Sequence, residues 1–431
     1  MSPGARRWIK YVLTIPISPW SFKALVYCLR KISFFRVPAP CSERGIQRIL
    51  VAHPYSSVGD LVLLLPLLEK VRSEWPAATV DIIVGSGASD LLSGVEGLHR
   101  IFICGSQNAR FALFGIYKRF FRNLLFYRRE IMSFDYDLAI APRWGSIMTS
   151  EAVYLAYLAG ASHRIGYSAT VDHGDPATDS LLTCAVTGGS LEHETTRNLR
   201  LLDRALLIQT PQEDGTAVNR TIASLRNLAR LSKALPEGIV FINKVRTRSG
   251  AFAVISPGAT RAFNRWPIQR LATVMRELYR KTGLHFYIIG SASDAPLCAN
   301  LASLVPDCST SIAGTTNLRQ LTCLLAESVL FLGMDSGTAH IAGGLGIPTL
   351  VISPFPFECK EELPNSSLRF RPCGPFVGVV QPVHPTFPCY PNCVLGEPHC
   401  ILQVGVEEVV MKALELIHHA GQSGKATNDS D

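Results

Sequence analysis

Residues 48–85 read RILVAHPYSSVGDLVLLLPLLEKVRSEWPAATVDIIVG, and the fold class follows from this segment. Its apolar runs at 49–55 and 79–85 predict two strands, and residues 60–75 between them predict a helix. A strand, a helix and another strand form the unit from which parallel sheets are built, because the helix returns the chain across the sheet. Both runs are nearly continuously apolar rather than alternating, which is typical of a sheet covered on both faces.

The same alternation continues along the chain in two blocks. In the first block, helices are predicted at 146–158 and around 194–207, and further strands at 100–104, 136–142 and 164–167. In the second block, strands are predicted at 251–257, 285–290, 310–313, 329–333 and 349–353. Helices are predicted there at 268–281, 294–304, 317–326 and 340–345. Two such blocks indicate two Rossmann-like α/β domains with parallel sheets, with ligands at the carboxyl ends of the strands and in a central cleft.

The domain boundaries follow from changes in pattern. Between the two blocks lies a polar stretch with little periodicity and a weak helix. We expect a basic N-terminal extension at 1–47, a first domain at 48–215, a linker region at 216–250, a second domain at 251–405, a C-terminal helix at 406–420 and a disordered tail at 421–431.

Composition excludes several classes of protein. Of the 431 residues, 47% are hydrophobic and 18% are charged, which is too apolar for a disordered chain. A membrane-spanning helix needs about 20 mostly apolar residues. The candidate run at 11–22 is short and contains two prolines, and those at 336–357 and 372–396 are broken by Gly and Pro. No signal-peptide cleavage site is convincing, and 12 mostly scattered cysteines suit a reducing compartment.

The net charge of +8 is unevenly distributed. Residues 1–49 and 110–129 carry fifteen Lys/Arg and one acid, Glu43, interleaved with aromatic residues. On a helix, four of these basic residues would share one face: Lys118, Arg119, Arg122 and Arg129. That pattern favours a helix lying on an anionic membrane surface, and the alternative is a domain helix with a merely solvated basic face. No zinc-finger, RRM or KH signature is present, so nucleic acid is not an expected partner.

The clearest chemical motif is residues 333–342, GMDSGTAHIA, which follow a predicted strand and open a helix. Ser336 and Gly337 allow a tight turn that leaves amide N–H groups exposed at the helix N-terminus, a suitable cradle for a diphosphate. His340, about one turn further, could donate a hydrogen bond to a phosphate oxygen. The alternative is that Asp335 and Ser336 only cap the helix and His340 is a buried core residue.

Two other loops follow predicted strands. In SSVGD, residues 56–60, Asp60 lies where the helix dipole keeps a carboxylate ionised, so that it could accept a proton from an attacking hydroxyl; otherwise it is an ordinary acid at a helix start. In SPGATRAFNRWP, residues 256–267, Thr260, Arg261 and Arg265 are candidate phosphate contacts or plain solvated loop residues.

A cysteine cluster is a weaker candidate. Cys389, Cys393 and Cys400 are spaced as in some structural zinc sites, and Cys373 lies upstream. Reduced cysteines in a proline-rich loop are the interpretation we favour, so no metal is expected.

Together these loops resemble the bacterial heptosyltransferase family of lipopolysaccharide core synthesis, over about residues 48–415. Residues 159–167, AGASHRIGY, and 193–199, HETTRNL, also look like family landmarks. The resemblance implies the GT-B fold of two Rossmann-like domains and an inverting glycosyltransferase that needs no cofactor. Where the family commonly has Lys two places before the Trp, this chain has Asn264, with Arg265 next to it.

By that resemblance, Asp60 is the general base that activates the acceptor hydroxyl. The donor-binding residues are then Thr260, Arg265, Asp335, Ser336, Gly337, Thr338 and His340. The implied partners are a nucleotide sugar, ADP-heptose, and a lipid-linked saccharide acceptor on an anionic membrane surface. The implied location is the cytoplasmic face of the inner membrane. The alternatives are a relative that uses another nucleotide sugar for O-antigen or capsule, and a catalytically silent lipid-surface binding protein; Asp60 together with the 335–340 turn argues against the silent one.

Overall fold

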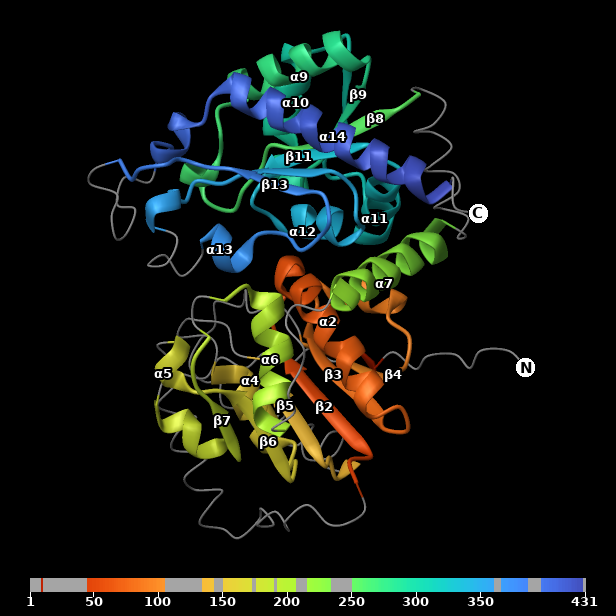
Figure 1. Cartoon of the computed structure of the whole chain (residues 1–431), viewed down its shortest axis with the longest axis vertical. Coiled ribbons are helices and arrows are strands. Elements are labelled where there is room, and N and C mark those ends of the chain that lie inside the picture. The colour runs from red at the N-terminus through yellow and green to blue at the C-terminus, as the bar shows by residue number, and fades with distance from the viewer. Residues whose placement is uncertain are drawn as a thin grey trace, which may run out of the picture.

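The computed structural model describes residues 9–10, 45–104, 134–142, 150–172, 176–189, 192–206, 215–233, 250–359, 366–386 and 397–428. These residues form two parallel sheets, one in each half of the chain, each flanked by helices (Figure 1). The predicted basic helix at 110–129, most of the extension at 1–47, and Cys389 and Cys393 lie outside the described residues. In the described part of the chain, no helix is long and apolar enough to cross a membrane.

The first sheet has seven strands in the order β1-β4-β3-β2-β5-β6-β7, and every pair is parallel. The strands are β1 Ile9–Lys10, β2 Arg48–His53, β3 Thr79–Gly85, β4 Leu98–Cys104, β5 Leu138–Ala141, β6 His163–Tyr167 and β7 Cys184–Val186. Its helices are η1 Ser89–Gly94, α2 Val58–Glu74, α4 Ser150–Leu158, α5 Ala169–Asp172, η5 Pro176–Leu181 and α6 Glu194–Leu206.

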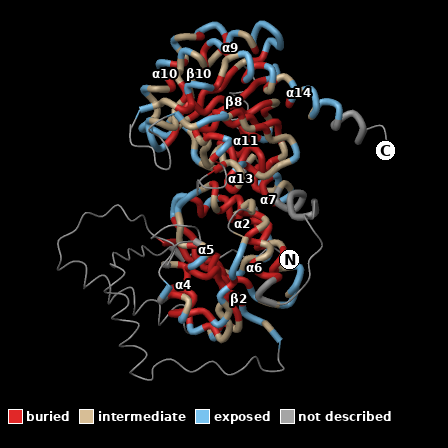
Figure 2. Tube along the Cα trace, turned by 60° about the vertical axis from the view of Figure 1, so that its left-hand side comes forward, coloured by how far each residue is buried: buried red, intermediate tan, exposed pale blue. Residues whose placement is uncertain are grey.

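The central strand β2 shows why both faces of this sheet are covered. Ile49 and Val51 share a buried cluster with residues of α2, and Leu50 and Ala52 share a different one with residues of α4. Alternate side chains of a strand point to opposite faces, so a strand with the continuous apolar run 49–52 needs a helical layer on each side. Figure 2 shows the resulting buried interior in each half of the molecule.

The second sheet has six parallel strands in the order β10-β9-β8-β11-β12-β13. The strands are β8 Phe252–Ser256, β9 His285–Ile288, β10 Ser309–Ser311, β11 Leu330–Met334, β12 Thr349–Ile352 and β13 Val377–Val380. The helices are η6 Ala262–Asn264, α9 Ile268–Thr282, η7 Ala292–Asp294, α10 Ala295–Leu304, α11 Leu318–Ala326, α12 Gly337–Gly344, η8 Phe357–Cys359, α13 Ser367–Phe370, η9 Cys400–Gln403 and α14 Val406–Asn428.

Helix α7, Gly215–Lys233, lies between the two halves (Figure 1). The Ser224 hydroxyl donates to Glu69 Oε1 of α2 at 2.9 Å, and Lys233 pairs with Glu327 at the end of α11 at 2.6 Å. Leu225 and Leu228 of α7 belong to the buried cluster that continues from the first half into the second. The region expected to be a linker therefore contains a helix that packs against both halves.

The α/β class with two parallel sheets is confirmed, and the differences from expectation are local. Strands β7 and β13 were not predicted, because the first has three residues and the second follows a Gly- and Pro-rich stretch. The C-terminal helix runs to Asn428, past the predicted start of a disordered tail at residue 421. Residues 422–428, QSGKATN, contain a second glycine, Gly424, and the weak helix formers Thr427 and Asn428, so local propensity does not account for this continuation.

Candidate active site

Asp60 occupies the first turn of α2, close to the carboxyl end of the central strand β2. Ser57 is the N-cap residue, and its hydroxyl accepts a hydrogen bond from the Asp60 amide at 3.4 Å. An acid in this position interacts favourably with the positive end of the helix dipole. The Asp60 side chain is half-buried, so it is still within reach of solvent and of a ligand.

The 335–340 turn follows β11 and opens α12 in the second half. Ser336 is the N-cap residue, but its hydroxyl does not cap the helix. It bonds instead to the Thr338 hydroxyl at 2.8 Å, and Thr338 contacts the Ser256 hydroxyl at 3.5 Å. Because no hydroxyl from Ser336 covers the first turn of α12, an anion could approach the amides there.

Two glycines bring Asp60 and the 335–340 turn together. A Cβ atom on Gly59 would lie 2.7 Å from Cδ2 of His340, and one on Gly337 would lie 2.7 Å from Cβ of Val58. Real side chains do not approach so closely, so only glycine permits this packing of α2 on α12. The N-terminus of α2, which flanks the first sheet, therefore contacts the N-terminus of α12, which flanks the second.

Burial governs the charges at this junction. It raises the pKa of Asp60 to about 7 and that of Asp335 to about 6, and it lowers the pKa of His340 to about 3. His340 is therefore neutral near pH 7. Its Nε2 atom lies 3.8 Å from Asp335 Oδ1, and within the described residues its Nδ1 atom is buried without a hydrogen-bond partner.

The 256–267 loop lies beside this turn because β8 pairs with β11, Ser256 opposite Gly333. Trp266 anchors it: the side chain is buried, and the amide contacts the Met334 sulfur at 3.3 Å. The Arg265 guanidinium donates from Nε to the Ala259 carbonyl at 3.0 Å, and Thr260 is exposed. Between these described segments, no hydrogen bond joins Thr260 or Arg265 to the 335–340 turn.

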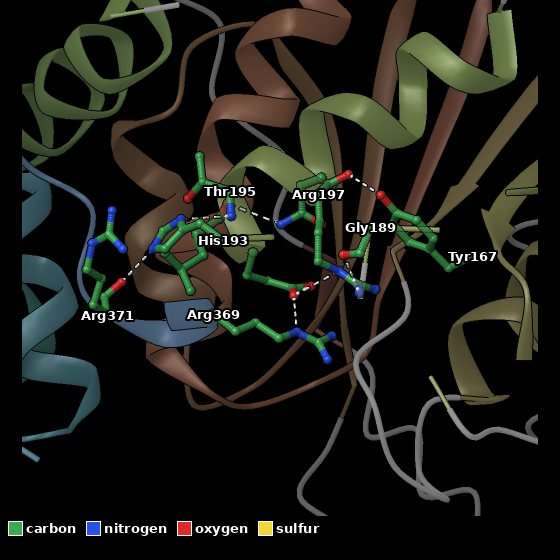
Figure 3. Close-up of polar contacts among 10 residues, drawn as sticks. Tyr167, Gly189, His193, Thr195, Arg197, Arg369 and Arg371 are labelled. Atoms are coloured by element: carbon green, nitrogen blue, oxygen red, sulfur yellow. Dashed lines mark hydrogen bonds and ion pairs between the residues drawn. The ribbon is translucent and has the colours of Figure 1, made fainter. Parts of the chain in front are cut away.

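A buried polar cluster next to the junction was not assigned a role from the sequence (Figure 3). Glu194, at the start of α6, pairs with Arg369 of α13 at 2.8 Å. The preceding residue, His193, bonds through Nε2 to the Arg371 carbonyl at 2.8 Å, and its Nδ1 atom accepts the Thr195 amide at 3.3 Å. The only sequence signal for this cluster was the 193–199 landmark, whose residues had no assigned function.

The described residues do not test the cysteine cluster. Cys373 and Cys400 are free, and Cys400 is buried and accepts a hydrogen bond from the Thr386 amide at 3.3 Å. Across the parts of the chain that the structure describes, no group of three or more His, Cys, Asp or Glu residues could hold a metal ion.

The sequence is similar to known glycosyltransferases. The model of glycosyltransferase family 9 (heptosyltransferase) matches residues 127–352. Lipopolysaccharide heptosyltransferase 3 of Escherichia coli is 21% identical over 298 residues, which cover 68% of this chain and 78% of that protein. Lipooligosaccharide heptosyltransferase 2 of Haemophilus ducreyi is 21% identical over 314 residues, 71% of this chain and 82% of that one.

Solved structures show the same fold. E. coli heptosyltransferase WaaC with ADP has a TM-score of 0.64 at 18% identity and covers 86% of this chain and 100% of its own. E. coli ADP-heptose lps heptosyltransferase II has a TM-score of 0.61 at 18% identity and covers 87% and 100%. The expected fold of two Rossmann-like units is therefore confirmed.

Proposed function

Because this chain belongs to glycosyltransferase family 9, the heptosyltransferases, we propose that it transfers a sugar from a nucleotide-diphosphate donor to a lipopolysaccharide core acceptor. One observation carries the proposal. Asp60 on the first sheet's helix is packed, through Gly59 and His340, against the open helix start of the 335–340 turn on the second. A transfer reaction needs a base and a leaving-group site next to each other, and this contact supports assigning the two roles to Asp60 and to the 335–340 turn.

In the proposed reaction, Asp60 takes the proton of the acceptor hydroxyl while the hydroxyl oxygen attacks the anomeric carbon of the donor. The new C–O bond forms on the face opposite the departing diphosphate, which leaves with the bonding electron pair, so the configuration inverts. A general base works best when its pKa lies near the working pH, and the pKa of Asp60, raised by burial to about 7, meets that condition.

The departing diphosphate is assigned to the second half of the molecule. The α12 amides and neutral His340 would donate to its oxygens. Asp335 has the same charge as the ligand, and its raised pKa lessens the repulsion. The remaining members of the donor-binding set are Thr260, Arg265, Ser336, Gly337 and Thr338. No cofactor has a role in this mechanism.

The identities of donor and acceptor are supported by relatives. E. coli WaaC has been solved with ADP and with ADP-2-deoxy-2-fluoro heptose, which favours ADP-heptose as donor. The curated relatives act on lipopolysaccharide or lipooligosaccharide, which favours a lipid-linked acceptor. With such an acceptor, the enzyme would work as a peripheral protein on the cytoplasmic face of the inner membrane.

The test combines binding and turnover. A thermal-shift screen against ADP-, GDP- and UDP-sugars should select ADP-heptose, since a ligand at 100 times its dissociation constant adds about 2.7 kcal/mol of stability. Asp60→Asn should keep that shift but lose turnover by about 10²–10⁴-fold, the usual contribution of a general base. Asp90→Asn, an exposed acid in η1, is the control and should behave as wild type. Near-wild-type turnover by Asp60→Asn would remove Asp60 from the mechanism.

A further inference from the structure

Glu194 is paired with two arginines that belong to different halves of the molecule. Arg197, one turn further along α6, places Nε 3.3 Å from Glu194 Oε2, and Arg369 of α13 places its Nε 2.8 Å from the same oxygen (Figure 3). All three side chains are buried. Buried charges are costly unless paired, and Arg197 alone already matches the charge of Glu194. Arg369 adds a second guanidinium, from the second half, to the same carboxylate.

The packing of α6 on α2 places this cluster beside Asp60. Asn198 Nδ2 donates to the Leu63 carbonyl at 3.2 Å, and further along the same two helices Lys70 pairs with Asp203. These contacts advance in the same direction on both helices, so the helices run parallel. The first turn of α6, which begins with Glu194, therefore lies level with the first turn of α2, which contains Asp60.

Several groups act on Asp60 at this level. The Ser57 hydroxyl caps its own helix, and Glu194 begins α6. Asp335 and His340 come from the 335–340 turn and α12, and Arg369 comes from α13. His193, directly before α6, acts on His340. Both histidines are neutral near pH 7, because burial lowers the pKa of His193 to about 4 and that of His340 to about 3. Among the described residues, the charged groups that act on Asp60 are thus the carboxyls of Glu194 and Asp335 and the guanidinium of Arg369.

We propose that Glu194 and Arg369 are positioning residues that set the ionisation of Asp60 by charges of opposite sign, Arg369 favouring the ionised base and Glu194 the protonated one. The inference rests on the proposed role of Asp60 as the general base. It follows from the placement of an interdomain ion pair next to a half-buried carboxyl, where charges interact strongly through the protein. The electrostatic balance at Asp60 agrees: Glu194 and Asp335 raise its pKa, and Arg369 lowers it.

A purely structural role makes a different prediction. If the pair only held the two halves together, removing either partner would weaken that contact, but it would not move the pH profile in opposite directions. If the pair instead sets the charge at Asp60, the two removals act in opposite directions. Glu194→Gln leaves Arg369 without its interdomain anion beside Asp60, and Arg369→Gln leaves Glu194 with Arg197 alone.

The experiment measures kcat/KM against pH, with ADP-heptose and lipopolysaccharide acceptor from a strain lacking the enzyme. In Arg369→Gln the acid limb of the profile should move to higher pH, because a charge that favours the ionised base is lost, and in Glu194→Gln it should move to lower pH. The double variant should return close to wild type. Lys233→Gln, which breaks a different interdomain ion pair at 2.6 Å, should leave the limb in place.

The direction of the shift in each variant tests the inference. If the acid limb shifts in the same direction in Glu194→Gln and Arg369→Gln, or does not shift in either, the inference is wrong. The ion pair would then only hold the two halves together. If Arg369→Gln fails to fold, Glu194→Gln must still move the limb down, and Arg369→Lys must keep the wild-type limb. Asp60→Asn in the same assay separates the two proposals: full activity there refutes the general base itself, whereas an inactive Asp60→Asn with unmoved limbs refutes only the role of the pair.

Discussion

Asp60→Asn should make the protein more stable above neutral pH, although it should also slow turnover by about 10²–10⁴-fold. The folded chain holds the pKa of Asp60 at about 7, against an ordinary value of 3.8, mainly because burial disfavours the ionised carboxyl. A folded pKa above the unfolded one means that this group destabilises the fold once it ionises. The stability that wild type has below about pH 4 is lost progressively as the pH rises to about 7. Asparagine does not ionise, so the Asp60→Asn variant keeps this stability as the pH rises.

The size of the effect follows from the shift. The difference between about 7 and 3.8 is about three pH units, and each unit corresponds to 1.36 kcal/mol, so the upper bound is about 4 kcal/mol. Asp60 is half-buried, and water screens part of its interaction with its surroundings. We therefore expect Asp60→Asn to exceed wild type by about 2 kcal/mol in free energy of unfolding at pH 8, and by close to zero at pH 4.

Urea unfolding at a series of pH values between 4 and 8 measures this difference directly. The matched control is Glu96→Gln, which neutralises an exposed acid in the same half and should show no comparable pH trend. A constant difference across the series, or a wild type that is the more stable protein at pH 8, would refute the account of Asp60 as a carboxyl destabilised by burial.

Two further predictions concern ligand and membrane. His340→Ala and Ser336→Ala should each weaken ADP binding by about 1.5–3 kcal/mol, the usual contribution of a hydrogen bond to a charged group; unchanged affinity in calorimetry would place the diphosphate elsewhere. Changing the four basic residues that would share one helical face to Gln should reduce binding to anionic vesicles by about 1 kcal/mol per residue at low salt, and sedimentation that shows no loss would contradict membrane docking. Those four are Lys118, Arg119, Arg122 and Arg129.

Most of the fold could be predicted because its strands and helices have clear local hydrophobic patterns. The predicted strand at 79–85 matches β3 residue for residue, and the helix predicted at 268–281 differs from α9 by one residue at its end. What failed was short or compositionally mixed. A three-residue strand such as β7 is shorter than the period-based signal that would identify it. Helix α14 continues through Gly421 and Gly424, two residues of low helix propensity that predict the end of a helix.

The candidate site was predictable only in pieces. Asp60 and the 335–340 turn each carry a local signature, a short loop between a strand and a helix, so both could be selected from sequence. Their contact depends on Gly59 meeting His340, far apart in the chain, and nothing local announces it. The same holds for Glu194 and Arg369, which lie 175 positions apart. Contacts of this kind depend on how the two sheets and their helices pack together. Composition and periodicity do not predict them.

Helix α7 has a practical consequence for anyone recombining halves of family members to change donor preference. Arg226 donates to the Leu345 carbonyl at 3.2 Å on the second half, while Ser224 donates to Glu69 on the first. A crossover before residue 215 would import a helix that fits the foreign partner but not the native α2. A crossover after residue 233 would retain one that fits α2 but not the incoming α11 and α12. Functional hybrids should therefore also need changes within α7. The residues of α7 that contact the half from the other protein should be exchanged for that protein's own residues, so that the helix fits both halves.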